Sequence, residues 1–158
     1  VFWNHGKSCN FVHWKPQNKT LNNENDSGQM TGEENIIRVL LVEDNELNQK
    51  FAMAVVRKMG FAIDVAPNGK IGVELFKSKN YHLVLMDIQM PEMNGIEATM
   101  EIRRIEAEEG QGKHVPIIAA TAFAMEQDKR NCINAGMDEF IAKPYKPFEL
   151  EQKIRMFL

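Results

Sequence analysis

Five polar side chains stand where apolar segments of this chain end: Glu43, Asp44, Asp87, Thr121 and Lys143. The clearest case is LVLM at 83–86, four apolar residues that run directly into Asp87. Three carboxylates brought close together would repel one another, so they would have to take up protons or bind a cation. All-oxygen ligation suits a hard divalent ion, and Mg²⁺ with few protein ligands and several waters fits best.

A cation at such a site predicts phosphoryl chemistry. Together with Lys143 opposite it, the ion would neutralise charge on a transferring phosphoryl group. Asp87 is flanked by the other carboxylates, which makes it the candidate nucleophile for an acyl phosphate. Taken one at a time, these residues have ordinary explanations, since Glu43 and Asp44 would also suit the start of a helix. Asn45 already fits that capping role, and a shared site requires that the fold bring the side chains together.

Apolar segments of strand length alternate with segments of helical periodicity from residue 36 onward. The predicted strands cover 36–42, 61–66, 82–86, 115–120 and 139–142. The predicted helices lie within 45–60 and around 71–76, and over about 95–106, 125–135 and 147–158. Between the third helix and the fourth strand, EAEEGQGKH at 106–114 indicates a polar loop.

This alternation predicts an α/β fold with one five-stranded, doubly wound parallel sheet and helices on both faces. Right-handed crossovers leave few topologies, and the strand order 2-1-3-4-5 is the natural one. In that order the first, third, fourth and fifth strands are successive neighbours. Their carboxyl ends meet at one edge, where open α/β sheets bind ligands, so the five polar side chains should share one pocket.

Composition divides the chain into three parts. Residues 36–158 carry the alternating pattern and are predicted to form one domain. Residues 15–35 contain almost nothing apolar, so they cannot offset their ordering entropy and are predicted to be a flexible linker. Residues 1–14 are too short for a domain and are expected to be the tail of an upstream region or a segment that docks on a partner. Because the first residue is Val1 and not Met, we expect a fragment of a longer protein.

The overall composition excludes several classes of protein. Hydrophobic residues make up 44% and charged residues 26%, the balance of a soluble globular domain. A net charge of -3 provides no basic field for nucleic acid or anionic lipid. No apolar run approaches the roughly 20 residues that span a bilayer, and no signal peptide is evident. Cys9 and Cys132 are far apart, which favours a reducing compartment and a cytoplasmic location.

The segments LLVEDN, LVLMDIQMPEMNG, IIAATA and FIAKP, in this order and spacing, resemble the receiver domain of two-component response regulators. More narrowly, VEDNELNQ and CINAGMDEFIAKP are similar to receivers carried at the C-terminus of hybrid histidine kinases. The resemblance covers residues 37–158 and identifies 36–158 as a receiver domain with the CheY-like form of the doubly wound fold. It implies a phosphorelay in which Asp87 accepts a phosphoryl group from a phosphohistidine and loses it by slow hydrolysis.

The resemblance also implies a magnesium site and a conformational switch. Mg²⁺ would be bound directly by Asp44 and Asp87, through water by Glu43, and by the backbone carbonyl of Gln89. Family members often carry Asp where this chain has Glu43, so the extra methylene lengthens the reach of that side chain. Gln89 and Ala122 stand where the family tunes the phosphoryl lifetime, and Ala122 should leave the pocket open.

The switch would respond to the phosphoryl group itself. Phosphorylation adds about -1.5 to -2 charge and three acceptor oxygens. Lys143 would pair with these oxygens, Thr121 would turn its hydroxyl toward them, and Phe140 would follow inward. The Lys143–Pro144 bond would be expected in the cis form. Partners would read the change on the face formed by the fourth helix, fifth strand and fifth helix.

The implied partners are a histidine kinase or a histidine phosphotransfer protein, with no direct contact to nucleic acid or membrane, and the chain would be a monomer or weak dimer. With no output domain after the last predicted helix, output is expected to pass to such a protein, to an upstream kinase core, or through protein contacts alone.

Two other classes of protein remain as alternatives to a receiver domain. A small-molecule phosphatase with an Asp nucleophile usually has a second Asp two residues later, where this chain has Gln89. A pseudo-receiver serving only as an interaction module would lack one of Asp44, Asp87 and Lys143, and all three are present.

Overall fold

The structure is a computed structural model that describes residues 36–110, 112–122 and 126–158, so the predicted linker at 15–35 and the segment 1–14 lie outside the described residues. Strands and helices alternate along the described chain. Their order is β1 (Arg38–Val42), α1 (Glu46–Lys58), β2 (Ala62–Ala66), α2 (Gly69–Ser78), β3 (Leu83–Asp87), α3 (Gly95–Glu109), β4 (Ile117–Thr121), α4 (Glu126–Ala135), β5 (Glu139–Ala142) and α5 (Pro147–Arg155). The predicted α/β class is confirmed.

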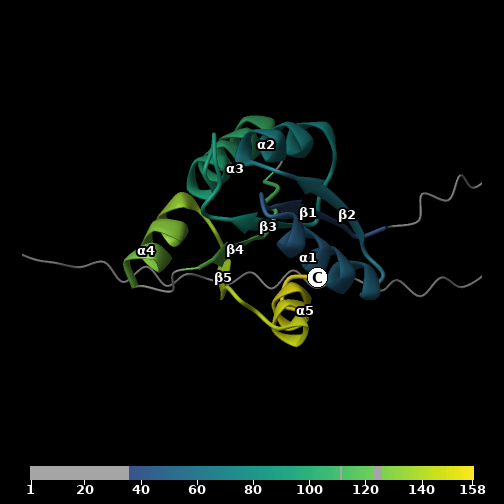
Figure 1. The fold of residues 1–158 in the computed structure, drawn as a ribbon. Helices are drawn as coiled ribbons and strands as arrows, with labels where there is room; N and C mark the ends of the chain where they lie inside the picture. The colour runs from purple at the N-terminus through teal and green to yellow at the C-terminus, as the bar shows by residue number, and fades with distance from the viewer. Residues whose placement is uncertain (1–35, 111, 123–125) are drawn as a thin grey trace, which may run out of the picture. The chain divides into compact units, whose positions relative to one another are not determined.

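The strands form one parallel sheet in the order β2-β1-β3-β4-β5, as predicted. Helices α2, α3 and α4 lie on one side of the sheet and α1 and α5 on the other (Figure 1). Both faces of the central strands are therefore covered, which explains why β3 and β4 are apolar almost throughout and buried along their whole length. The chain reverses winding direction between β1 and β3, where doubly wound sheets bind their ligands.

The side chains of alternate residues of each central strand point into two separate hydrophobic cores. Leu40 and Val42 of β1 point into the core under α2 and α3, whereas Val39 and Leu41 point into the core under α1 and α5. Each of these side chains is at most 3% exposed. Burial of a Val or Leu side chain contributes about 1.5–3 kcal/mol. The rigidity of the sheet, and with it the position of every strand end, follows from this two-sided packing.

Asparagine begins three of the helices at the carboxyl edge of the sheet. Asn45 accepts hydrogen bonds from the first turn of α1, Asn68 from that of α2, and Asn94 forms a capping box with Glu97 at the start of α3. Because each cap lies only a few residues beyond a strand, it fixes the short loop between strand and helix. The loop that carries Glu43 and Asp44 is thus held between β1 and the cap of α1.

The predicted loop at 106–114 is wrong for its first four residues, because α3 continues to Glu109. The sequence EAEE is polar throughout except for Ala107, a composition that favours a loop. Glu106 is nevertheless buried, since its carboxylate accepts a hydrogen bond from Arg103 Nη1 at 2.6 Å and from the backbone N–H of Val115 at 2.7 Å. Compensated in this way, its charge can occupy the inner face of the helix. At the other end of the chain, α5 stops at Arg155, short of the predicted Leu158.

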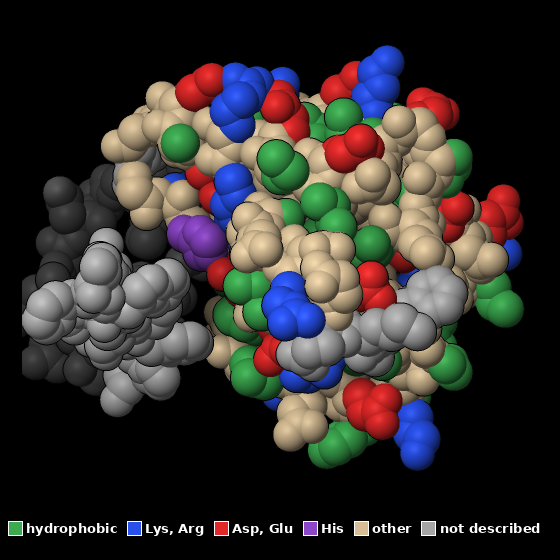
Figure 2. All heavy atoms as spheres, turned by 90° about the vertical axis from the view of Figure 1, so that its left-hand side faces the viewer, with side chains coloured by type: hydrophobic (Ala, Val, Ile, Leu, Met, Phe, Trp, Pro, Cys, Tyr) green, Lys and Arg blue, Asp and Glu red, His purple; other side chains and the backbone are tan. Residues whose placement is uncertain are grey.

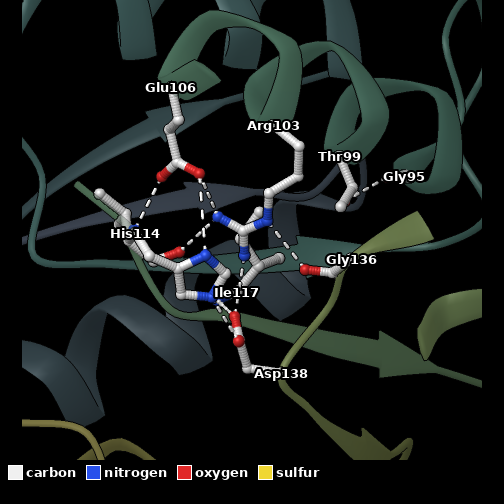
Figure 3. A network of polar contacts seen from close by, with 9 residues as sticks. Gly95, Thr99, Arg103, Glu106, His114, Ile117, Gly136 and Asp138 are labelled. Carbon is white, nitrogen blue, oxygen red and sulfur yellow. Dashed lines mark hydrogen bonds and ion pairs between the residues drawn. The ribbon is translucent and has the colours of Figure 1, made fainter. Parts of the chain in front are cut away.

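A polar network centred on Arg103 holds the N-terminal edge of β4 and β5 (Figure 3). The guanidinium reaches four groups: the carbonyl oxygens of Gly136 (2.8 Å) and Val115 (3.0 Å) and the carboxylates of Glu106 (2.6 Å) and Asp138 (2.8 Å). His114 lies beside the same carboxylates, with Nε2 2.6 Å from Asp138 Oδ1. One arginine therefore joins α3 to the segments that precede both strands.

The described surface carries charges of both signs. On the face shown in Figure 2, acidic and basic side chains are interspersed and hydrophobic side chains are mostly scattered. Such a face offers no extended single-sign field. Within the described residues, every helix is too short or too polar to cross a membrane.

Candidate functional site

The predicted polar residues meet at the carboxyl edge of the sheet. Glu43 and Asp44 directly follow β1, and Asp87 is the last residue of β3. Thr121 is the last residue of β4, and Lys143 directly follows β5. The backbone N–H of Lys143 donates to the carbonyl of Thr121 at 2.7 Å, so the ends of these two neighbouring strands are joined.

Three carboxylates form one cluster. Glu43, Asp44 and Asp87 each contribute one oxygen to a group whose members all lie within 4.8 Å of one another. Glu43 and Asp87 are buried, 1% and 6% exposed respectively, whereas Asp44 is exposed. The cluster thus opens to solvent on the side of Asp44. The remaining predicted ligand, Gln89, is exposed, and its backbone N–H donates to Asp87 Oδ1 at 3.2 Å.

Lys143 bridges two of the carboxylates. Its Nζ lies 2.6 Å from Glu43 Oε2 and 2.7 Å from Asp87 Oδ2. The lysine side chain is only 16% exposed, so these charge-assisted contacts are poorly screened by water. One ammonium beside three carboxylates leaves a surplus of negative charge in a partly buried cluster.

The pKa of Asp87 reflects chiefly its burial. Burial raises the pKa of Asp87, and the negative charge of Glu43 raises it further. The hydrogen bond and positive charge of Lys143, together with the N–H of Gln89, only partly oppose the increase. Asp87 is therefore a carboxylate whose ionised form gains from any additional positive charge.

The donor set fits a hard divalent cation. Every potential ligand side chain in the cluster offers oxygen, and the net charge is negative even with Lys143 present. Sites with one or two carboxylates, retained water and a partly open rim suit Mg²⁺. The acidic cluster predicted from the sequence is thus formed, and it is chemically suited to such an ion.

Close backbone packing fixes the backbone of Asp87 at the end of β3. The N–H of Gly95 donates to the carbonyl of Ile88 at 3.0 Å. A Cβ at position 95 would lie 2.1 Å from the carbonyl oxygen of Asp87, well inside van der Waals contact. Only glycine permits this approach, and so the start of α3 is pressed against the backbone of the candidate acceptor.

The predicted switch residues lie on the two strands that follow β3 in the sheet, Thr121 at the end of β4 and Phe140 within β5. Thr121 is buried at 5% exposure, and Ala122 after it is exposed. Phe140 on β5 is half-buried, and its ring lies 4.6 Å from Lys129 Nζ and 5.8 Å from Lys153 Nζ. The Lys143–Pro144 peptide bond is cis.

Sequence reasoning missed two residues of the site. Asn48 Nδ2 donates to Glu43 Oε1 at 2.9 Å, an interaction that the helical spacing of the segment does not reveal. Tyr145 packs against Phe51 with ring centroids 5.6 Å apart. Burial, followed by the charges of Glu43 and Asp87, raises the pKa of Tyr145 to about 12, so its phenol stays protonated beside the cluster. Its place directly after Pro144 was the available signal.

The doubly wound sheet and the acidic pocket with its lysine define a phosphoacceptor receiver of the two-component type. A sequence model described as the response regulator receiver domain matches residues 39–155, and this chain belongs to that family. The family assignment confirms the resemblance and the phosphorelay role inferred from the sequence, and it does not favour a pseudo-receiver or a phosphatase.

Three relatives illustrate the similarity. Hybrid signal transduction histidine kinase I of Dictyostelium discoideum is 46% identical over 115 residues, 70% of this chain but only 6% of that kinase. The receiver domain of sensor histidine kinase PA1611 from Pseudomonas aeruginosa, crystallised with magnesium coordinated in its active site cleft, is 38% identical, with TM-score 0.69 over 77% of this chain and 97% of that one. A co-crystal structure of the Saccharomyces cerevisiae phosphotransfer protein Ypd1 and the receiver of Ssk1 matches at 34% identity, with TM-score 0.71 over 77% and 88%.

Proposed function

We propose that Asp87 is the residue that accepts the phosphoryl group, with Mg²⁺ as the assisting ion. In the transfer, a carboxylate oxygen of Asp87 forms a bond to phosphorus. The bond between phosphorus and the imidazole nitrogen of the donor histidine breaks, and that nitrogen keeps the electron pair. Because the other ring nitrogen of the donor carries a proton during the transfer, the products are an acyl phosphate on Asp87 and a neutral histidine on the partner.

The observation that carries the proposal is the burial of Asp87 against a second carboxylate, with a single lysine between them. Glu43, Asp44 and Asp87 would hold the ion, with the Gln89 carbonyl as a further ligand, and the bound ion would supply charge neutralisation for the phosphoryl oxygens. Lys143, now 2.7 Å from Asp87 Oδ2, would transfer its contact to a phosphoryl oxygen once the acyl phosphate forms.

The same site would drive the switch. Three new acceptor oxygens on Asp87 would draw the hydroxyl of Thr121 toward them. Movement at the end of β4 would free space for Phe140 to turn inward, away from Lys129 and Lys153. We infer that α4, β5 and α5 carry this change to partners.

Phosphoryl acceptance is tested on the wild-type chain. Incubation with phosphoramidate and Mg²⁺ should add one phosphoryl group, and excess EDTA should prevent the addition because the carboxylate cluster would remain uncompensated. Borohydride reduction of the acyl phosphate, followed by peptide mapping, should locate the group at Asp87. Modification at a histidine or serine instead, or turnover of small phosphate esters without a stable adduct, would contradict the proposal.

We infer that a histidine phosphotransfer protein reaches the pocket over the first turns of α1 and α5. Leu47 on α1 is 76% exposed and Phe148 on α5 is 71% exposed. The contact between the rings of Phe51 and Tyr145 joins α1 to the loop that precedes α5. Apolar side chains this exposed beside a site suit a protein partner, and the co-crystallised Ypd1 and Ssk1 receiver support a partner of this class.

Leu47→Asp should slow phosphoryl transfer from phosphorylated yeast Ypd1 by about ten-fold, because a charge replaces an apolar contact at the interface. Phosphorylation by phosphoramidate should change by less than about two-fold, since the acceptor itself is intact. Met100→Asp on α3, which replaces another exposed apolar side chain, is the control and should behave as the wild type. Equal loss with both donors would show that Leu47 affects the acceptor site and not docking.

A further inference from the structure

Glu43 has the most enclosed carboxylate of the cluster, and its two oxygens have different partners. Oε2 accepts a hydrogen bond from Lys143 Nζ at 2.6 Å. Oε1 accepts from Asn48 Nδ2 at 2.9 Å and from the backbone N–H of Asn45 at 3.3 Å. Because both oxygens are engaged, the orientation of the carboxylate is fixed from two sides.

Asn48 is well placed to act on Glu43 alone. Its backbone N–H already donates to the capping oxygen of Asn45 at 3.2 Å, so the side chain is not needed to begin α1. The next residue, Gln49, donates from Nε2 to the backbone carbonyl of Glu43 at 2.8 Å. Two consecutive side-chain amides on α1 therefore hold the same residue, one at its carboxylate and one at its backbone.

Lys143 alone does not fix the carboxylate of Glu43, because its ammonium is shared with Asp87. Lys143 Nζ contacts Asp87 at 2.7 Å as well, and phosphorylation of Asp87 would draw it toward the phosphoryl oxygens. Glutamate also has one more rotatable bond than aspartate, so its carboxylate needs more restraint to stay in place. The side-chain amide of Asn48 lies on α1, so its hydrogen bond to Glu43 does not depend on the position of the Lys143 ammonium.

We propose that Asn48 is a positioning residue of the cation site, acting through Glu43. Its amide holds the Glu43 carboxylate in the orientation in which the carboxylates of Glu43, Asp44 and Asp87 face one ion. The inference rests on the proposed function and extends its metal site. Groups that orient metal ligands in this way commonly affect affinity strongly although they never touch the metal.

Magnesium affinity tests the role directly, without phosphorylation. A titration of the ¹⁵N-labelled chain with MgCl₂, followed by NMR, should give a dissociation constant about ten-fold weaker for Asn48→Ala than for the wild type. Asn48→Ser, whose side chain is too short to reach Glu43, should weaken binding similarly. Asn131→Ala on α4 is the matched control, because Asn131 is an exposed helical asparagine bonded only to Gln127 among the described contacts. Dispersed spectra show that each variant is folded.

A double-mutant cycle with Glu43→Ala distinguishes positioning from a general effect. If Asn48 acts through Glu43, then Asn48→Ala in the Glu43→Ala background should change the dissociation constant by less than about two-fold. An undiminished loss in that background would overturn the route through Glu43. Wild-type affinity in Asn48→Ala would overturn the positioning role and leave the proposed function intact, whereas a wild-type chain that binds no Mg²⁺ would overturn both.

Discussion

Asp87→Asn is expected to abolish phosphoryl acceptance altogether. After incubation with phosphoramidate and Mg²⁺, the wild-type chain should gain one phosphoryl group, whereas the variant should keep its unmodified mass. The reason is that an amide oxygen carries no full negative charge and is a poor nucleophile, although the side chain keeps its size and shape. Intact-protein mass spectrometry on parallel reactions measures the difference.

Asp64→Asn is the control for this change. Asp64 lies on β2, and its Oδ2 accepts hydrogen bonds from Tyr81 at 2.9 Å and Lys79 at 3.1 Å, outside the acidic cluster. The control should be phosphorylated as efficiently as the wild type. Modification of Asp87→Asn to the same extent as Asp64→Asn would rule out Asp87 as the acceptor.

A second measurement on Asp87→Asn concerns stability without Mg²⁺. Burial, reinforced by Glu43, raises the folded-state pKa of Asp87, so folding favours the protonated form. The stability that this proton contributes is present below the unfolded-state pKa and is lost as pH rises through the folded-state pKa. At pH 7 the free energy of unfolding of the variant should therefore be higher than that of the wild type. The difference should shrink as pH falls below the ordinary range of Asp, which urea denaturation at several pH values would reveal.

The position of the cluster was predictable because few topologies satisfy the sequence pattern. Once five apolar segments alternate with amphipathic ones, right-handed crossovers bring the ends of β1, β3, β4 and β5 to one edge. Asp87 and Lys143 are far apart in the chain, but this topology places both at the carboxyl edge of the sheet. The prediction required only strand periodicity and connectivity, which the backbone determines.

The contacts made by long side chains were not predictable in the same way. Asn48 reaches back to Glu43, and Arg103 reaches the segments before β4 and β5, because of rotamers and helix orientation that no spacing rule contains. The end of α3 was misjudged for the same reason, since the polarity of Glu106 indicates a loop until its partner Arg103 is known. Pairwise charge compensation across distant segments has no local signal in one sequence.

Arg103→Met is expected to cost about 3–5 kcal/mol of the free energy of unfolding, because it leaves a buried charge without its partner. Arg103 is 17% exposed, and its removal leaves the carboxylate of Glu106, 6% exposed, without its cation. The carbonyls of Gly136 and Val115 lose their side-chain donor as well. Urea denaturation followed by far-ultraviolet circular dichroism measures the loss.

The neighbouring arginine provides a matched control. Arg104 also forms ion pairs, with Glu101 and Glu108, but its side chain is 52% exposed. Since exposed pairs contribute little, Arg104→Met should cost less than about 1 kcal/mol. Adding Glu106→Met to Arg103→Met should recover part of the loss, because replacing both buried charges removes the uncompensated one. Equal costs for the two arginines, or no recovery in the double variant, would mean that the buried charge of Glu106 is not the source of the effect.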